Sequence, residues 1–168
     1  IAIPVIGFLY DEIRECILFG LYGAAISLSA VLVEFSLKEA IIRKKNGKTY
    51  NQVEWDRIEG IELAKIIAEA KHDGLIDDEM EQALISFKNT VRNLYLHYNI
   101  KKITKDVGAN KIKKVDTTTS KVEELDLAAK DNPILWSFAK RFVDKERVFD
   151  VFTFADRVVK YLFENKQA

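Results

Sequence analysis

Residues 17–33, ILFGLYGAAISLSAVLV, carry no charged side chain, and this segment constrains the fold more than any other. A helix that is apolar on all sides has to be surrounded, either by lipid or by the rest of a protein. The segment contains two glycines and two serines, and it runs without a turn signal into the charged residues 34–45. We therefore predict a central helix of a bundle rather than a membrane span. A break near Phe19–Gly20 is expected to separate it from an earlier helix.

The rest of the chain is predicted to be largely helical, because apolar residues recur every three or four positions. The expected helices cover residues 10–20, 21–45, 54–76 and 77–100. Asn132 and Pro133 fit the start of a further helix, and Asp144 fits the cap of a last one. Residues 101–131, between the helix predicted over residues 77–100 and Asn132, are rich in lysine and threonine. This composition predicts a mostly irregular connection with a short strand or hairpin near residues 108–110.

These patterns predict an all-α fold, an up-and-down bundle of four core helices with additional C-terminal helices. The 168 residues suffice for one domain with a sizeable core, so residues 1–168 are assigned to a single domain. Within it, residues 8–100 would form the core bundle, residues 101–131 the lysine-rich connection and residues 132–168 the C-terminal helices.

Composition limits the partners and the chemistry. The net charge is zero, so a nucleic-acid partner would have to be bound by a local patch. The single cysteine, Cys16, cannot form an intramolecular disulfide, which favours a reducing, cytoplasmic compartment and a packing role. One cysteine and two histidines offer few zinc ligands, and no phosphate-binding glycine loop occurs, so neither metal nor cofactor is expected. No charged stretch precedes an apolar run at the start, so no signal peptide is predicted either.

The stretch VRNLYLHYN, residues 91–99, places Arg92, Asn93 and His97 inside a run of apolar residues. At about 100° per residue, Asn93 and His97 lie on one side of a helix. Arg92 leaves from the other flank, from where its long side chain can reach across. The core stripe of this helix is predicted to contain Leu84, Phe87, Val91, Leu94 and Tyr98. A second apolar stripe, Ile85 and Leu96, would need a cover from another helix or from a second subunit.

These three polar residue types suit RNA cleavage. An imidazole can take a proton from a 2′-hydroxyl near neutral pH, and a guanidinium can bind the phosphate and stabilise the charge of the transition state. An asparagine can orient the imidazole or bind a phosphate oxygen. A structural interpretation stands beside this one. In it, Arg92 pairs with a surface carboxylate, His97 caps the end of its helix, and the other histidine, His72, interacts with a helix dipole.

Residues 92–97 read Arg-Asn-x-x-x-His, which resembles the Arg-x(4–6)-His signature of the HEPN superfamily of small helical-bundle proteins, where a polar residue often follows the arginine. Residues 16–41 resemble the early helices of that family, and residues 70–97 resemble its approach to the motif. The resemblance covers roughly residues 8–100. One departure is that Asn99 stands two places after the histidine, where a common family form has a tyrosine that partner enzymes modify.

The resemblance implies a metal-independent endoribonuclease that acts as a homodimer, with two copies of the motif in one composite cleft. His97 would be the acid and base, Arg92 the phosphate clamp, Asn93 the orienting residue and Glu34 a support for the arginine. Alternatively, Glu34 is a surface carboxylate at the point where the helix leaves the core. Such domains occur in toxin–antitoxin, restriction and other defence systems, so an antitoxin or a larger restriction protein is an expected partner.

Lys101, Lys102 and Lys105 follow the motif directly and could bind an RNA backbone, although a solvated loop would have the same composition. Two functional hypotheses therefore remain. The first is the homodimeric ribonuclease. The second is a non-catalytic HEPN-like domain that serves a larger nuclease or restriction protein in dimerisation or RNA binding; the zero net charge and the start at Ile1 without a methionine favour it.

Overall fold

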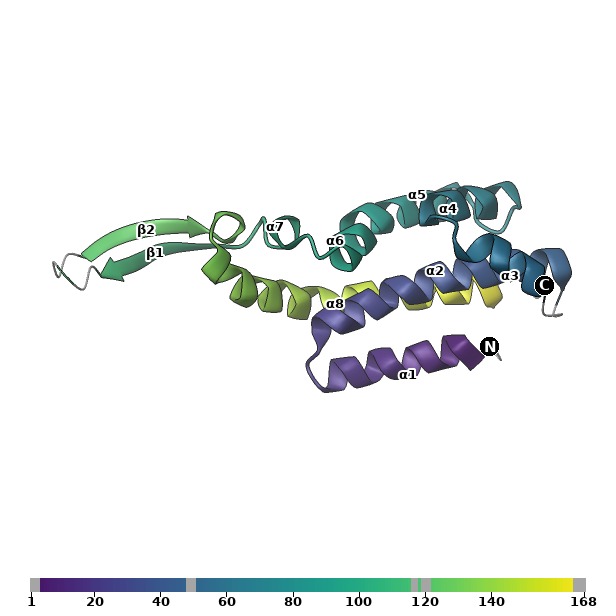
Figure 1. Ribbon diagram of the computed structural model, residues 1–168, viewed down its shortest axis with the longest axis horizontal. Coiled ribbons are helices and arrows are strands. Elements are labelled where there is room, and N and C mark those ends of the chain that lie inside the picture. Colours follow the sequence, from purple (N-terminus) through teal and green to yellow (C-terminus); the bar gives the residue numbers. More distant parts are fainter. Residues whose placement is uncertain (1–3, 48–50, 116–117, 119–121, 165–168) are drawn as a thin grey trace.

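The computed structural model describes residues 4–47, 51–115, 118 and 122–164. Over these residues the protein is an all-α helical bundle, as predicted, and a two-stranded hairpin extends from one end of it (Figure 1). The helices run along the long axis of the molecule, and both ends of the described chain lie at the end opposite the hairpin (Figure 1).

Helix α1 (Pro4–Leu18) and helix α2 (Tyr22–Asn46) form a helical hairpin, and α2 is the centre of the bundle. The chain turns between them at Gly20, whose φ of +72° is readily adopted only by glycine. Buried positions occur on every turn of α2 from Ala25 to Ile42, because α1, α8 and the α4–α6 segment surround it. The predicted central helix and the break before it are confirmed. No helix in the described part of the chain is both long and apolar enough to cross a membrane.

The single helix predicted over residues 54–76 is wrong, because two helices occupy this region. Helix α3 (Gln52–Glu59) starts after Asn51, whose side chain accepts a hydrogen bond from the Glu54 amide, and it ends at Gly60. Glu62 then adopts an extended backbone and precedes helix α4 (Leu63–His72). Glycine disfavours a continuous helix, and the break redirects the chain so that α4 begins near the end of α6.

The helix that carries the motif is continuous but not uniformly α-helical. Helix α5 (Asp78–Phe87) is capped by Asp77, which accepts a 2.8 Å hydrogen bond from the Met80 amide, as its acidic start predicts. A π-helical turn, η1 (Lys88–Arg92), follows, and helix α6 (Asn93–Leu96) completes the run. The expected extent to residue 100 is too long. The chain leaves the helix at His97 and starts a separate short helix, α7 (Ile100–Ile103).

The π turn and the early end of α6 also change the predicted core stripe. Leu84, Phe87 and Val91 are buried as expected, whereas Tyr98 is 64% exposed and Tyr95 is buried in its place. Tyr98 adopts a φ of +48° just after the helix. The amide of Asn99 reaches back to the Leu94 carbonyl at 2.8 Å, the bond that closes a Schellman-type helix end.

The mostly irregular connection predicted for residues 101–131 is also wrong. After α7, strand β1 (Gly108–Val115) pairs antiparallel with strand β2 (Val122–Ala128), and a 3₁₀ turn, η2 (Ala129–Asp131), returns the chain to the bundle. The hairpin is much longer than the short element expected near residues 108–110. Residues 116–117 and 119–121 of the predicted connection lie outside the described residues.

One helix, α8 (Pro133–Phe163), replaces the two helices predicted at the C-terminus. Pro133 is its first residue, as expected. Asp144 does not cap a helix. It is only 6% exposed in the middle of α8, where its carboxylate accepts hydrogen bonds from Tyr95 and Lys140. Because these side chains satisfy both oxygens, Asp144 does not compete with the backbone, and the helix continues through it.

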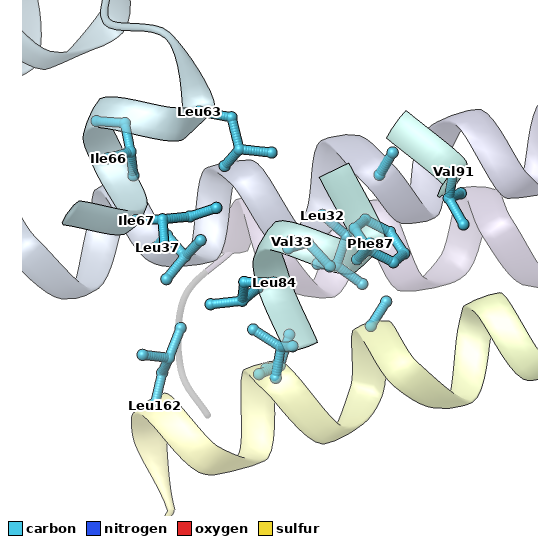
Figure 2. Close-up of a cluster of buried hydrophobic side chains, with 14 of the residues drawn as sticks. Leu32, Val33, Leu37, Leu63, Ile66, Ile67, Leu84, Phe87, Val91 and Leu162 are labelled. Atoms are coloured by element: carbon cyan, nitrogen blue, oxygen red, sulfur yellow. The ribbon is translucent and has the colours of Figure 1, made fainter. Parts of the chain in front are cut away.

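The main core lies where α4 and α5 cover α2 and α8. Figure 2 shows Leu37 of α2 beside Ile67 of α4 and Leu32 of α2 beside Phe87 of α5, while Leu84 of α5 and Leu162 of α8 lie in the same cluster. Phe87 and Val91 extend this packing toward the motif. The buried side chains thus hold the motif helix against α2, and Arg92 comes next to the middle of the central helix.

Candidate functional site

Arg92, Asn93 and His97 line one pocket of about 790 Å³. The pocket lies between the end of the motif helix and the beginning of α4. The other lining residues come from these two places and from the start of α7; they are Glu62, Leu63, Ala64, Lys88, Asn89, Leu94, Asn99 and Lys102. The fold therefore gathers the sequence-predicted motif around one concave surface.

Arg92 reaches this pocket from the end of the π turn. A regular α-helix would send Arg92 to the flank opposite His97. Arg92 is the last residue of η1, and its long side chain reaches across to the pocket. Arg92 and Asn93 both line the pocket, and the Nη1 atom of Arg92 donates a 3.3 Å hydrogen bond to Oδ1 of Asn93.

The guanidinium of Arg92 is anchored on the central helix. Its Nη2 atom lies 3.1 Å from Oε2 of Glu34, and both side chains are mostly buried. The expected support of Arg92 by Glu34 is therefore present as a contact. The Nε atom of Arg92 is buried and has no hydrogen-bond acceptor among the described residues. Its own chain thus leaves part of the guanidinium's donor capacity unused.

Lys38, which was not predicted from the sequence as a site residue, binds the other oxygen of Glu34. The ammonium of Lys38 lies 3.0 Å from Oε1 of Glu34 and donates a 2.8 Å hydrogen bond to the carbonyl of Glu59 at the end of α3. The spacing of four residues between Glu34 and Lys38 on a helix is a signal that could have revealed the pair. Glu34 is thus partly buried and bridges two cations, unlike the surface carboxylate of the alternative interpretation.

His97 is exposed, and its ring has no hydrogen-bond or ion-pair partner within the described chain. It is the residue that ends α6, but its ring makes no contact with the last carbonyls, so the predicted capping role of the side chain is not observed. The imidazole is therefore accessible to a ligand in the pocket.

The charges around the pocket are mainly positive. Lys88 and Lys102 line it together with Arg92, and the only carboxylate in the lining is Glu62. Of the three lysines predicted to bind RNA, Lys102 alone joins the pocket. Lys101 lies over the ring of Trp136 at 6.0 Å, and Lys105 lies 3.9 Å from Asp106.

The first turn of α4 adds a polar backbone to the same pocket. Leu63 and Ala64 are its first two residues, and no side chain caps their end of the helix. Free amides and the helix dipole make such an end favourable for an anion. This helix end was not predicted from the sequence, because the break at Gly60 that creates it was missed, and Lys88 was not predicted as a site residue either.

A second polar cluster lies on the other side of α6. The hydroxyl of Tyr95 donates a 2.8 Å hydrogen bond to Oδ1 of Asp144, and Lys140 bonds the other oxygen. Burial and this hydrogen bond raise the pKa of Tyr95 above its usual range. Lys140 also lies over the rings of Tyr95 and Tyr98. The cluster borders a separate pocket of about 520 Å³ at the start of α2.

The remaining sequence candidates lie away from the motif pocket. His72 is exposed at the end of α4, and Cys16 is partly buried against the core. Over the described residues, no three His, Cys, Asp or Glu side chains are grouped as metal ligands would be. No protein-family model matches the chain, and no curated protein and no solved structure matches it significantly.

Proposed function

We propose that the protein is a metal-independent endoribonuclease of the HEPN type that acts as a homodimer in a defence or toxin–antitoxin system. The observation that carries this proposal is the shared pocket, in which Arg92, Asn93 and an accessible His97 lie among further cations. A phosphodiester requires positive charge and hydrogen-bond donors around its oxygens, and cleavage of RNA requires a group that moves protons.

The proposed reaction is an internal displacement at phosphorus. His97 takes the proton of the 2′-hydroxyl, the 2′-oxygen forms a bond to phosphorus, and the bond to the 5′-oxygen breaks. Arg92 and Lys102 stabilise the negative charge that develops on the phosphate oxygens. An imidazolium returns a proton to the leaving 5′-oxygen. The products are a 2′,3′-cyclic phosphate and a 5′-hydroxyl, so atoms and charge balance without another reactant.

The proposed dimer is supported by apolar surface beside the motif. Leu96 is 39% exposed and Tyr98 is 64% exposed, and they flank His97 in the chain. Ile85, the other member of the predicted second stripe, packs partly against the core of its own chain. A second copy placed on Leu96 and Tyr98 would bring a second imidazole to the same cleft, which would provide separate acid and base groups.

Cleavage of RNA in the presence of EDTA tests this proposal. The purified protein is expected to cut RNA with the chelator present, and His97→Ala is expected to lower the rate at least about a hundredfold, the usual contribution of a general acid or base. His72→Ala is the matched control, because the other histidine lies outside the pocket. Loss of activity on chelation, or equal activity of His97→Ala, would contradict the proposal.

A specific observation favours the second function, a non-catalytic RNA-binding or dimerisation domain of a larger nuclease or restriction protein. Arg92 is already paired with Glu34, and among the described residues no side chain orients the ring of His97. This alternative expects RNA binding that persists in His97→Ala, with no cleavage by the unsubstituted protein.

A further inference from the structure

Lys38 is a buried cation next to the candidate site. It is 8% exposed, although it lies on the central helix among apolar side chains. Lysine is rarely so buried unless its charge has a partner. Its ammonium has two, the Glu34 carboxylate and the Glu59 carbonyl, where the end of α3 also favours a positive charge.

Glu34 connects Lys38 to the motif. Each of its oxygens contacts a different cation, with Oε1 at 3.0 Å from Lys38 and Oε2 at 3.1 Å from Arg92. Arg92 is therefore held through a single Nη2 contact and not through the paired contact that guanidinium and carboxylate form when nothing competes. The bridge fixes the direction of Arg92 without taking up all of its donors.

The charges of this bridge matter for a phosphate ligand. Arg92 and Glu34 alone would be a neutral pair, whereas Lys38, Glu34 and Arg92 together carry one net positive charge. We infer that Lys38 is a positioning residue. It binds one oxygen of Glu34 and offsets its charge, so that Arg92 stays oriented and the site remains cationic toward a phosphate. This inference rests on the proposed function, because it assigns Lys38 a role in the binding step of that site.

Binding of an uncleavable RNA tests the inference separately from catalysis. The probe is a fluorescent, single-stranded 2′-O-methyl RNA, whose blocked 2′-oxygen cannot attack. Lys38→Met is expected to raise its dissociation constant about tenfold, because Glu34 then neutralises Arg92 at close range. Lys38→Arg, which keeps the charge, is expected to bind like the unsubstituted protein.

The double variant Lys38→Met with Glu34→Gln distinguishes charge from structure. It removes both charges of the pair and leaves Arg92 fully cationic, so binding is expected to return to within about threefold of the unsubstituted protein. Neutral replacement of a buried pair is usually tolerated by the fold, which keeps this test usable if Lys38→Met alone is unstable. With Glu34 no longer orienting Arg92, cleavage by the double variant should still be slow.

Arg43→Met is the matched control. Arg43 pairs with Glu39 on the same helix with the same spacing of four residues, at 2.6 Å, but lies outside the pocket. Its loss should not change RNA binding.

Unchanged binding by Lys38→Met, or a double variant that binds no better than Lys38→Met, would overturn the role of Lys38 and leave the nuclease proposal standing. Cleavage by His97→Ala at the normal rate would refute the nuclease while leaving the binding series valid. No RNA binding by the unsubstituted protein would refute both.

Discussion

The hydroxyl of Tyr95 donates a 2.8 Å hydrogen bond to Oδ1 of Asp144, and this bond joins the motif helix to the middle of α8. Tyr95 lies two residues before His97, so the contact fixes the end of α6 from which the imidazole extends. Both side chains are buried, and Lys140 occupies the second oxygen of Asp144.

Tyr95→Phe is expected to destabilise the protein by about 1–3 kcal/mol, because a buried acceptor loses its donor. Urea unfolding monitored by circular dichroism measures this change. Tyr98→Phe is the control, since Tyr98 is exposed and contacts Lys140 through its ring alone among the described residues. An equal loss in both variants would show that the Tyr95 hydroxyl contributes nothing specific.

The buried hydroxyl of Tyr95 is also expected to make the protein less stable at alkaline pH. Burial, followed by the hydrogen bond to Asp144, raises the pKa of Tyr95 in the folded state. Its contribution is therefore complete below the pKa of an unfolded tyrosine, about 10, and is lost as the pH rises above that value. The free energy of unfolding should therefore fall as the pH rises above about 10, and it should fall less steeply in Tyr95→Phe. Identical slopes would contradict this account of the buried hydroxyl.

A side chain at Gly23 is expected to disturb the pair formed by Asp144 and Lys140. A Cβ at this position in α2 would lie 2.7 Å from Oδ2 of Asp144 and 2.8 Å from the ammonium of Lys140, two groups that bond each other. Gly23→Ala should therefore cost about 1–3 kcal/mol of unfolding free energy. Gly7→Ala in α1, where a Cβ meets no atom within 4 Å, should instead stabilise by about 0.5–1 kcal/mol. Thermal denaturation of the two variants side by side measures this difference in stability. Stabilisation of the protein by Gly23→Ala would contradict the prediction.

The ionised carboxylate of Glu69 is expected to stabilise the protein, and this stabilisation is expected to be lost at acidic pH. The hydrogen bond from Arg57 lowers the pKa of Glu69, against an opposing effect of burial, and Lys45 lowers it further. The stabilisation by the Glu69 carboxylate is complete above the pKa of a glutamate in the unfolded chain, about 4.3. It is lost as the pH falls through the lower pKa that Glu69 has in the folded protein. Glu69→Gln should be less stable than the unsubstituted protein at pH 7 by up to about 1 kcal/mol, with the difference shrinking toward pH 3. Glu146→Gln, which removes an exposed carboxylate outside any ion pair of the described chain, should show no such dependence. A difference independent of pH would contradict the ion-pair explanation.

The helical character of the chain could be predicted because most helices have strong signals. Residues 17–33 carry no charge, so other helices have to surround them. The cap at Asp77 and the proline at position 133 mark helix starts. The errors arise where side-chain contacts in the fold override local signals. Asp144 resembles a cap in the sequence, but Tyr95 and Lys140 satisfy it inside a helix.

The candidate site was predictable in its residue types but not in its geometry. Arg92, Asn93 and His97 stand out because they interrupt an apolar run. The pocket that they line also needs the beginning of α4, which follows a break at Gly60 in a region whose apolar spacing predicted one continuous helix. Lys38 was missed because its importance comes from two partners, one of which lies on a different helix.

Analysis of RNA ends tests the central claim most directly. A short RNA is incubated with the protein in EDTA. A second RNA of the same sequence has a 2′-deoxy nucleotide on the 5′ side of the linkage that is cut in the first. If Arg92 and His97 promote attack by the 2′-hydroxyl, the first gives a 2′,3′-cyclic phosphate and a 5′-hydroxyl, and the second is not cut at that linkage. Cleavage of the 2′-deoxy linkage, or products with a 5′-phosphate, would contradict the account.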